Sequence, residues 1–148
     1  MTKTNDRSRQ VLYRIMDANA NRAMEGLRVC EEVARFVLEH QSLARRLRTI
    51  RHALALSVRK LSGTALLALH RDALQDVGRS FGSHRYTPGR WQELLLANAS
   101  RVKEALRVLE EFSRLLDGAS APRFQQIRFR FYAWERAALA ELARLRYH

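Results

Sequence analysis

One polar pattern occurs twice in the sequence with the same spacing. An asparagine is followed three residues later by an arginine and six residues later by a glutamate: Asn19, Arg22 and Glu25, then Asn98, Arg101 and Glu104. Arginine holds phosphate groups through paired, charge-assisted hydrogen bonds, and carboxylate oxygens are the ligands that Mg²⁺ prefers. The two sets together suit phosphoryl transfer, in which phosphate charge must be held and neutralised.

The pattern belongs to a longer internal duplication, which relates residues 18–36 to residues 97–115. The copies also share a leucine, two arginines and a pair of glutamates: Leu27, Arg28, Glu31, Glu32 and Arg35 recur as Leu106, Arg107, Glu110, Glu111 and Arg114. Apolar residues repeat at heptad spacing through both copies, which predicts two amphipathic helices.

Three residues of each copy conflict with this apolar pattern. On a helical wheel Asn19 and Arg22 lie inside the apolar arc and Glu25 lies at its margin, and the second copy repeats the conflict. A charge that faces a core is costly unless it is paired or liganded. We therefore weigh two interpretations. One is a polar cavity between two helices, and the other is a buried salt-bridge network that joins Arg22 to Glu25 and Arg101 to Glu104.

Other charges are arranged as ordinary surface pairs. Opposite charges four residues apart on a helix stabilise it by only a few tenths of a kcal/mol. The sequence predicts four exposed pairs of this kind: Arg28 with Glu32, Glu31 with Arg35, Arg107 with Glu111, and Glu110 with Arg114.

The formal net charge is +12, and nearly all the positive charge is arginine. Such a balance attracts polyanions, including nucleotides, sugar phosphates, nucleic acid or an anionic membrane. An arginine excess can also follow simply from GC-rich coding.

The elements that must position these residues are expected to be four long helices. Their predicted ranges, placed from caps, proline, glycine and heptad spacing, are about 6–40, 42–62, 87–116 and 120–145, with a short extra helix at 64–70. The first pair of long helices resembles the second, so the duplicated unit is a helical hairpin, about 8–62 and 87–145. We expect one all-α domain over residues 1–148, a compact bundle with a glycine-containing connection between its halves.

That connection, and the flanks of the repeats, supply further candidates. Arg71 could hold phosphate beside Arg22 and Arg101, while Asp72 and Asp76 could hold Mg²⁺ with help from Glu25 or Glu104. Glycine-rich backbone can also offer N–H groups to phosphate. The candidates for binding substrate or nucleotide are Asn19, Asn98, Asp17, Gly78, Arg14, Arg51 and Arg128.

The sequence lacks the motifs of several classes of enzymes and of membrane or secreted proteins. The sequence has no P-loop, no Rossmann fingerprint, no His-Glu-x-x-His, and no Glu-x-x-His pattern of a di-iron bundle. The single cysteine, Cys30, lies on the apolar stripe and is expected to be a core residue. No apolar run is long enough to span a membrane, and the N-terminus lacks the apolar core of a signal peptide. These features favour a cytoplasmic protein.

Three of these motifs resemble a known family, the small helical hydroxymethylpyrimidine phosphate kinases. These occur alone or fused ahead of thiamine phosphate synthase. The resemblance covers roughly residues 11–139 and rests on three motifs in the same order: Arg14-Ile-Met-Asp17-Ala18-Asn19 with Arg22 and Glu25-Gly26-Leu27-Arg28-Val29, then Arg71-Asp72 with Asp76-Val77-Gly78, then Ala97-Asn98 with Arg101 and Glu104-Ala105-Leu106-Arg107.

The resemblance implies ATP-dependent phosphorylation of 4-amino-5-hydroxymethyl-2-methylpyrimidine phosphate to the diphosphate. Together with the carboxylates above, it leads us to expect ATP and Mg²⁺ as cofactors. No synthase barrel follows position 148, so a stand-alone form is expected. The alternative functions are a basic helical module that binds nucleic acid or regulates, and a non-catalytic oligomerisation domain. Arginines interleaved with glutamates, without a recognition helix, argue against nucleic acid. The sequence leaves the oligomeric state open, a homo-oligomer included.

Overall fold

A computed structural model describes residues 3–62 and 87–146 of the chain. The elements within these ranges are α1 (Lys3–Glu32), the π-helix η1 (Val33–Val37), α2 (Gln41–Ser62), α4 (Trp91–Ser113) and α5 (Ala121–Leu145). The described part of the chain contains no strand, and the all-α prediction is confirmed. The expected helix at 64–70 and the connection that contains Arg71 lie outside the described residues.

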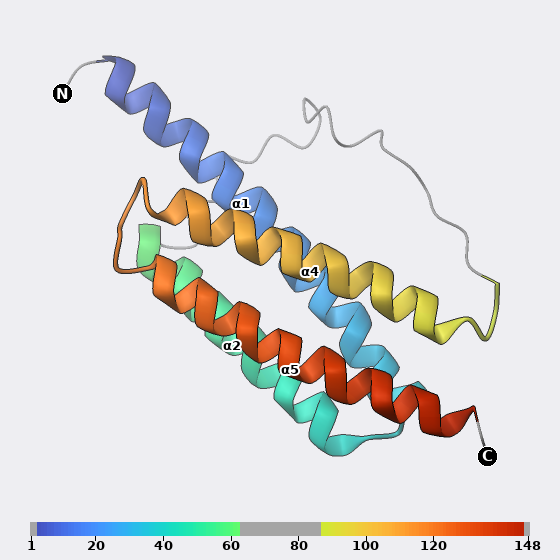
Figure 1. Ribbon diagram of the computed structural model, residues 1–148. Helices are drawn as coiled ribbons and strands as arrows, with labels where there is room; N and C mark the ends of the chain where they lie inside the picture. The colour runs from blue at the N-terminus through green and yellow to red at the C-terminus, as the bar shows by residue number, and fades with distance from the viewer. Residues whose placement is uncertain (1–2, 63–86, 147–148) are drawn as a thin grey trace.

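The four helices form a ring of neighbours. α1 and α4 lie side by side and run in opposite directions, and α2 pairs with α5 in the same way (Figure 1). Each helix also packs against its hairpin partner, α1 against α2 and α4 against α5. Exchanging the two hairpins leaves this order of contacts unchanged, as expected for a duplicated unit.

The helix ends differ most from the expected ranges at the end of the first helix and at the start of the third. The first helix was expected to reach His40, but it changes to a π-helix at Val33, and the chain turns at Glu39, which has a positive φ of 48°. His40 then accepts a hydrogen bond at Nδ1 from the backbone N–H of Leu43, 3.2 Å away, and so caps α2. Proline does not start the third long helix, because residues 87–90 form a turn and α4 begins at Trp91.

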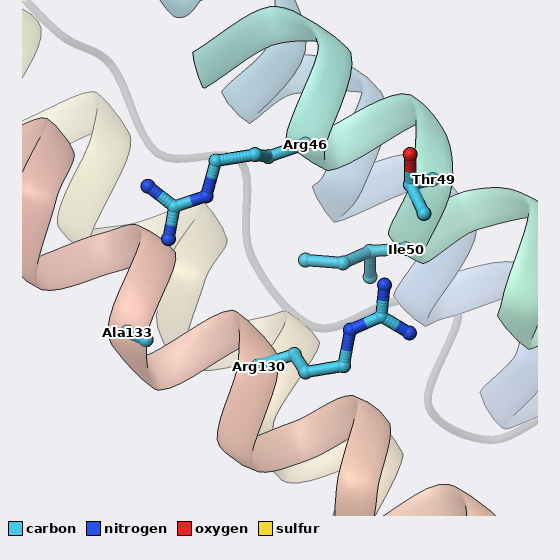
Figure 2. Close-up of a pocket in the computed structure, with 5 residues that line it drawn as sticks. All are labelled: Arg46, Thr49, Ile50, Arg130 and Ala133. Carbon is cyan, nitrogen blue, oxygen red and sulfur yellow. The ribbon is translucent and has the colours of Figure 1, made fainter. Parts of the chain in front are cut away.

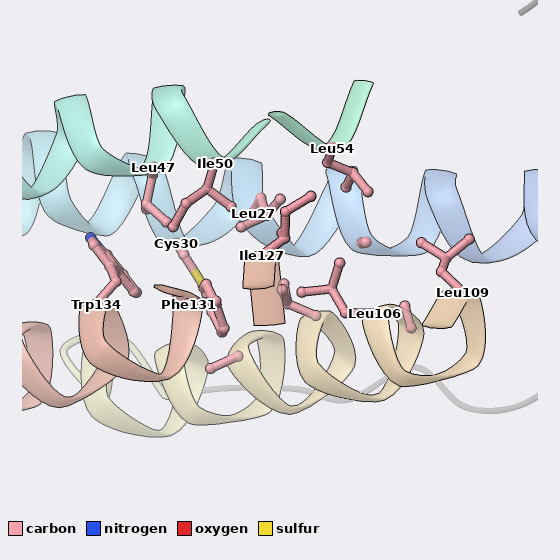
Figure 3. Packing of buried hydrophobic residues seen from close by; sticks show 14 of the residues in the cluster. Leu27, Cys30, Leu47, Ile50, Leu54, Leu106, Leu109, Ile127, Phe131 and Trp134 are labelled. Carbon is pink, nitrogen blue, oxygen red and sulfur yellow. The ribbon is translucent and has the colours of Figure 1, made fainter. Parts of the chain in front are cut away.

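The core lies between the two helix pairs and is built from the heptad stripes. Figure 3 shows leucines of α1, α2 and α4 together with the aromatic side chains of α5 in one cluster. Phe131 and Trp134 are fully buried and stack with their ring centroids 5.6 Å apart. The Trp134 indole donates a hydrogen bond to the Leu43 carbonyl oxygen at 2.9 Å, which joins α5 to the start of α2.

α1 and α4 approach each other closely at Gly26. A Cβ atom at this position would lie 2.7 Å from Cγ2 of Val102 and 3.1 Å from the carbonyl oxygen of Asn98. The equivalent positions in the repeat are Ala105, for Gly26, and Ala23, for Val102, and both alanines are buried. A glycine–valine pair on one side of the crossing therefore corresponds to an alanine–alanine pair on the other.

Each hairpin is closed by a buried ion pair in the same place. Glu31 of α1 meets Arg51 of α2 at 2.8 Å, and Glu110 of α4 meets Arg128 of α5 at 2.8 Å. The Glu31 and Glu110 side chains are only 2% and 1% exposed. A buried carboxylate without a partner is costly, so these pairs fix how each hairpin closes.

The Gly26 contact predicts that alanine is harmful there although it favours helices. Gly26→Ala should lower the free energy of unfolding, measured by urea denaturation, by about 1–3 kcal/mol, because the new methyl group would lie 2.7 Å from Cγ2 of Val102, a side chain with little rotational freedom in a helix. The double variant Gly26→Ala/Val102→Ala recreates the pair found at Ala23 and Ala105 and should recover most of the loss. A gain of about 1 kcal/mol for Gly26→Ala alone, as helix propensity predicts, would contradict the close approach.

The buried ion pairs predict unequal effects at adjacent glutamates. Glu110→Gln leaves the Arg128 guanidinium without its counter-charge and should lower the free energy of unfolding by roughly 3 kcal/mol. Glu111→Gln removes an exposed carboxylate and should cost less than about 1 kcal/mol. Chemical denaturation of both variants makes the comparison, and equal small losses would show that the Glu110 pair does not hold the hairpin.

Candidate functional site

The two asparagines of the repeated pattern are held in the same way. Asn19 and Asn98 are 7% and 8% exposed, and each amide donates a hydrogen bond to the carbonyl four residues earlier, Ile15 and Leu94 respectively, at 2.9 Å. Arg22 Nη1 donates to Asn19 Oδ1 at 3.3 Å. The asparagines are therefore fixed supports on the helices, and Asn19 orients the arginine that follows it.

The arginines and glutamates of the pattern do not face the core. Arg22, Glu25, Arg101 and Glu104 are all exposed, which corrects the expectation that the arginines lie within the buried arc. The helical wheel assigned Arg22 to the buried arc of α1. In the structure α1 packs against α4 at Gly26, one turn after Arg22, and the Arg22 side chain is exposed beside that contact. Long arginine stems can reach water from such a flank.

Both sets flank the same helix crossing. Gly26 follows Arg22 by one turn of α1, and Gly26 meets α4 at Asn98 and Val102, the latter next to Arg101. Each arginine therefore lies within about one turn, ~5.4 Å along its helix, of the crossing. Two exposed guanidiniums from different helices thus border one contact, which suits two neighbouring phosphate groups.

The salt-bridge interpretation fails for these residues. Within the described ranges, no ion pair joins Arg22 to Glu25 or Arg101 to Glu104. The two most deeply buried carboxylates belong instead to Glu31, which was expected in a surface pair, and to its equivalent in the repeat, Glu110. A signal for this was present in the sequence, because Glu31 follows the core residue Leu27 by four positions and shares its face.

The predicted surface pairs are confirmed only in part. Arg28 meets Glu32 at 3.4 Å and Arg107 meets Glu111 at 2.9 Å, as expected. Arg35 pairs with Glu32 at 3.4 Å and not with the buried Glu31. In the second copy, Nη2 of Arg114 lies 3.5 Å from Oε1 of the buried Glu110.

The remaining candidates are divided between surface and interior. Arg14 is exposed and Asp17 is buried. Arg51 and Arg128, expected to bind substrate, are occupied by the buried carboxylates, so we leave both out of the proposed phosphate contacts. Burial opposes the charge of Arg128, but hydrogen bonds with Tyr132 and Glu110 outweigh it and raise the pKa of the guanidinium.

The described residues do not form a metal site by themselves. No group of three or more His, Cys, Asp or Glu side chains that could hold an ion occurs in residues 3–62 and 87–146. Glu25 and Glu104 offer one exposed carboxylate on each helix of the crossing. Asp72 and Asp76, expected to be the main ligands, lie outside the described residues, as do Arg71 and Gly78.

Cys30 is a core residue, as predicted. Its side chain has no exposed surface, and burial, with a smaller effect of the Glu135 charge, raises the pKa of the thiol to about 12. The thiolate is the nucleophilic form, so the raised pKa leaves very little of the Cys30 thiol reactive at pH 8.

This burial predicts how Cys30 reacts with a thiol reagent. At pH 8 the folded protein should react with Ellman's reagent at least about a hundredfold more slowly than the urea-unfolded protein, because both access and ionisation are suppressed. Absorbance at fixed reagent concentration measures both rates. Similar rates in the two states would show that the α1–α4 side of the core opens readily.

The comparisons with known proteins agree on one family. The ThiD2 family profile matches residues 14–137, which include both copies of the polar pattern. No solved structure matches the chain. Within the described ranges, every helix is too short or too polar to cross a membrane.

Several curated relatives share the name thiamine-phosphate synthase. One from Rhodopirellula baltica is 41% identical over 143 residues, covering 96% of this chain and 38% of the relative. One from Synechocystis sp. is 44% identical over 130 residues, covering 86% of this chain and 36% of the relative. The chain thus spans little more than a third of the length of these relatives. The family profile covers most of the sequence, and the chain belongs to the ThiD2 family.

Proposed function

We propose that this chain transfers a phosphoryl group from ATP to 4-amino-5-hydroxymethyl-2-methylpyrimidine phosphate and so forms the diphosphate. Family membership and the name of the relatives connect the chain to thiamine biosynthesis. The observation that carries the proposal is the pair of exposed arginines, Arg22 and Arg101, which flank one helix crossing. A reaction between two phosphorylated substrates needs two cationic positions of this kind.

The chemistry requires positioning more than proton transfer. An oxygen of the acceptor phosphate forms a bond to the γ-phosphorus of ATP, while the bond from that phosphorus to the bridging oxygen breaks and ADP leaves with the electron pair. The attacking oxygen is already anionic, so no general base is needed. In the proposal, Arg22 and Arg101 each hold one of the two phosphate groups, and Asn19 positions Arg22 through its hydrogen bond.

Mg²⁺ fits the oxygen-only donors that the chain offers. We propose that Asp72 and Asp76 hold it with Glu25 or Glu104, whose carboxylates border the crossing. A bound Mg²⁺ would neutralise phosphate charge. The amides of Asn19 and Asn98 already donate hydrogen bonds to carbonyls of their own helices, so we assign them no direct contact with a ligand.

The proposal predicts a separation of stability from activity. Arg22→Met and Arg101→Met should each change Tm by no more than about 2 °C, because both side chains are exposed and neither neutralises a buried charge. Each should lower kcat at least about a hundredfold, since charge stabilisation of the transition state is lost. Tm comes from thermal unfolding, and turnover comes from coupled ADP release with the pyrimidine monophosphate and Mg-ATP.

Arg136→Met is the matched control, because Arg136 is an exposed arginine of α5. It should retain both normal Tm and normal turnover. Near-normal turnover in Arg22→Met and Arg101→Met, or unfolding of either variant, would remove these arginines from the site. No turnover in the unaltered chain, together with salt-sensitive retention of DNA or RNA, would instead favour a nucleic-acid-binding module.

A further inference from the structure

Two further arginines line a cavity between α2 and α5. The cavity has a volume of about 220 Å³ and is lined by Arg46, Thr49, Ile50, Arg130 and Ala133. Figure 2 shows Arg46 reaching from α2 towards α5, and Arg130 reaching from α5 towards α2, with Ile50 between them. The cavity is thus bordered by one arginine from each helix, with the two guanidiniums on either side of Ile50.

The charge in this cavity is uncompensated. None of the lining residues is a carboxylate, and within the described ranges neither Arg46 nor Arg130 has an ion pair or a hydrogen bond through its side chain. Like charges that face a common cavity repel each other, and an anion between them removes that cost. The planar fork of donors on each guanidinium matches the oxygens of a phosphate group.

Part of the cavity lining is apolar. Ile50 is buried at 2% exposure, and Ala133 adds a methyl group from α5. The volume is below the ~300 Å³ at which pockets for drug-sized ligands begin. A small ligand with a phosphate at one end and an apolar part at the other matches both features.

Only one of the two arginines, Arg46, has an arginine at the equivalent position of the repeat. Aligning the hairpins through their buried ion pairs makes Arg123 the equivalent of Arg46, but it makes Ala53 the equivalent of Arg130 and Leu56 the equivalent of Ala133. The equivalent helix of the first hairpin, α2, therefore has alanine where α5 has Arg130. The pair of arginines is a feature of one side of the α2–α5 contact alone.

We propose that this cavity binds a small phosphate monoester. Arg46 and Arg130 hold the phosphate, and Ile50 and Ala133 contact the organic part. The cavity belongs to the α2–α5 pair, whereas the proposed transfer site belongs to the α1–α4 pair on the other side of the core. The inference therefore does not depend on the proposed kinase activity.

Methyl NMR of the full chain tests this binding locally. Phenyl phosphate is titrated at constant ionic strength, adjusted with sodium chloride, while the Ile50 and Ala133 methyl signals are followed. Both signals should shift and saturate together. Arg46→Gln and Arg130→Ala should each weaken binding about tenfold or more, since each removes charge-assisted hydrogen bonds. Arg123→Gln, the matched control from the repeat, should leave the affinity within about twofold.

The same titration with inorganic phosphate separates the two sources of a phosphate group. Inorganic phosphate should bind several-fold more weakly, because it lacks the apolar part. Equal affinity for the two ligands would overturn the ester assignment. Methyl signals that do not saturate, or an equal loss in Arg123→Gln, would show only nonspecific attraction to a basic chain. Phosphate binding at Arg22 and Arg101 would not move these methyl signals, so the two proposals fail independently.

Discussion

The close approach of α1 to α4 at Gly26 is the constraint on which the arrangement depends. With no side chain at this position, the backbone of α4 at Asn98 comes into direct contact with α1. A larger residue would separate the helices and move Arg22 relative to Arg101. Because an internal duplication relates the two helices, the same contact brings both copies of the polar pattern to one crossing. Packing and the proposed chemistry thus rest on one glycine.

The repeated charges divide into two groups with opposite surroundings. Glu31 and Glu110 lie inside the hairpins, where each neutralises an arginine of the partner helix. Arg22 and Arg101 lie outside, where solvent screens them and where no buried carboxylate requires them. Charges of the first group hold the fold, and charges of the second are free to meet a ligand. The duplication therefore places a buried ion pair in each hairpin and an exposed arginine on each helix of the α1–α4 crossing.

Much of the fold could be predicted from the sequence, because heptad stripes and the repeat specify helices and their pairing. The direction of the charged side chains was predicted less well, although the position of Glu31 one turn after Leu27 carried a signal for its burial. Arg22 was expected inside and Glu31 outside, because a helical wheel has one buried arc and does not show where a second helix replaces solvent along its edge. Nor could the sequence show the π-helix at Val33, since that change depends on packing at the helix end. The choice of charged partners, Arg51 for Glu31, follows from tertiary contacts alone.

A crystal structure of the chain with a non-hydrolysable ATP analogue, Mg²⁺ and the pyrimidine monophosphate would test whether both phosphates bind at the α1–α4 crossing. We expect the terminal phosphate of the analogue and the phosphate of the pyrimidine to lie next to each other there. One should contact Arg22 and the other Arg101. Phosphates bound elsewhere, with both of these guanidiniums left in solvent, would contradict this expectation.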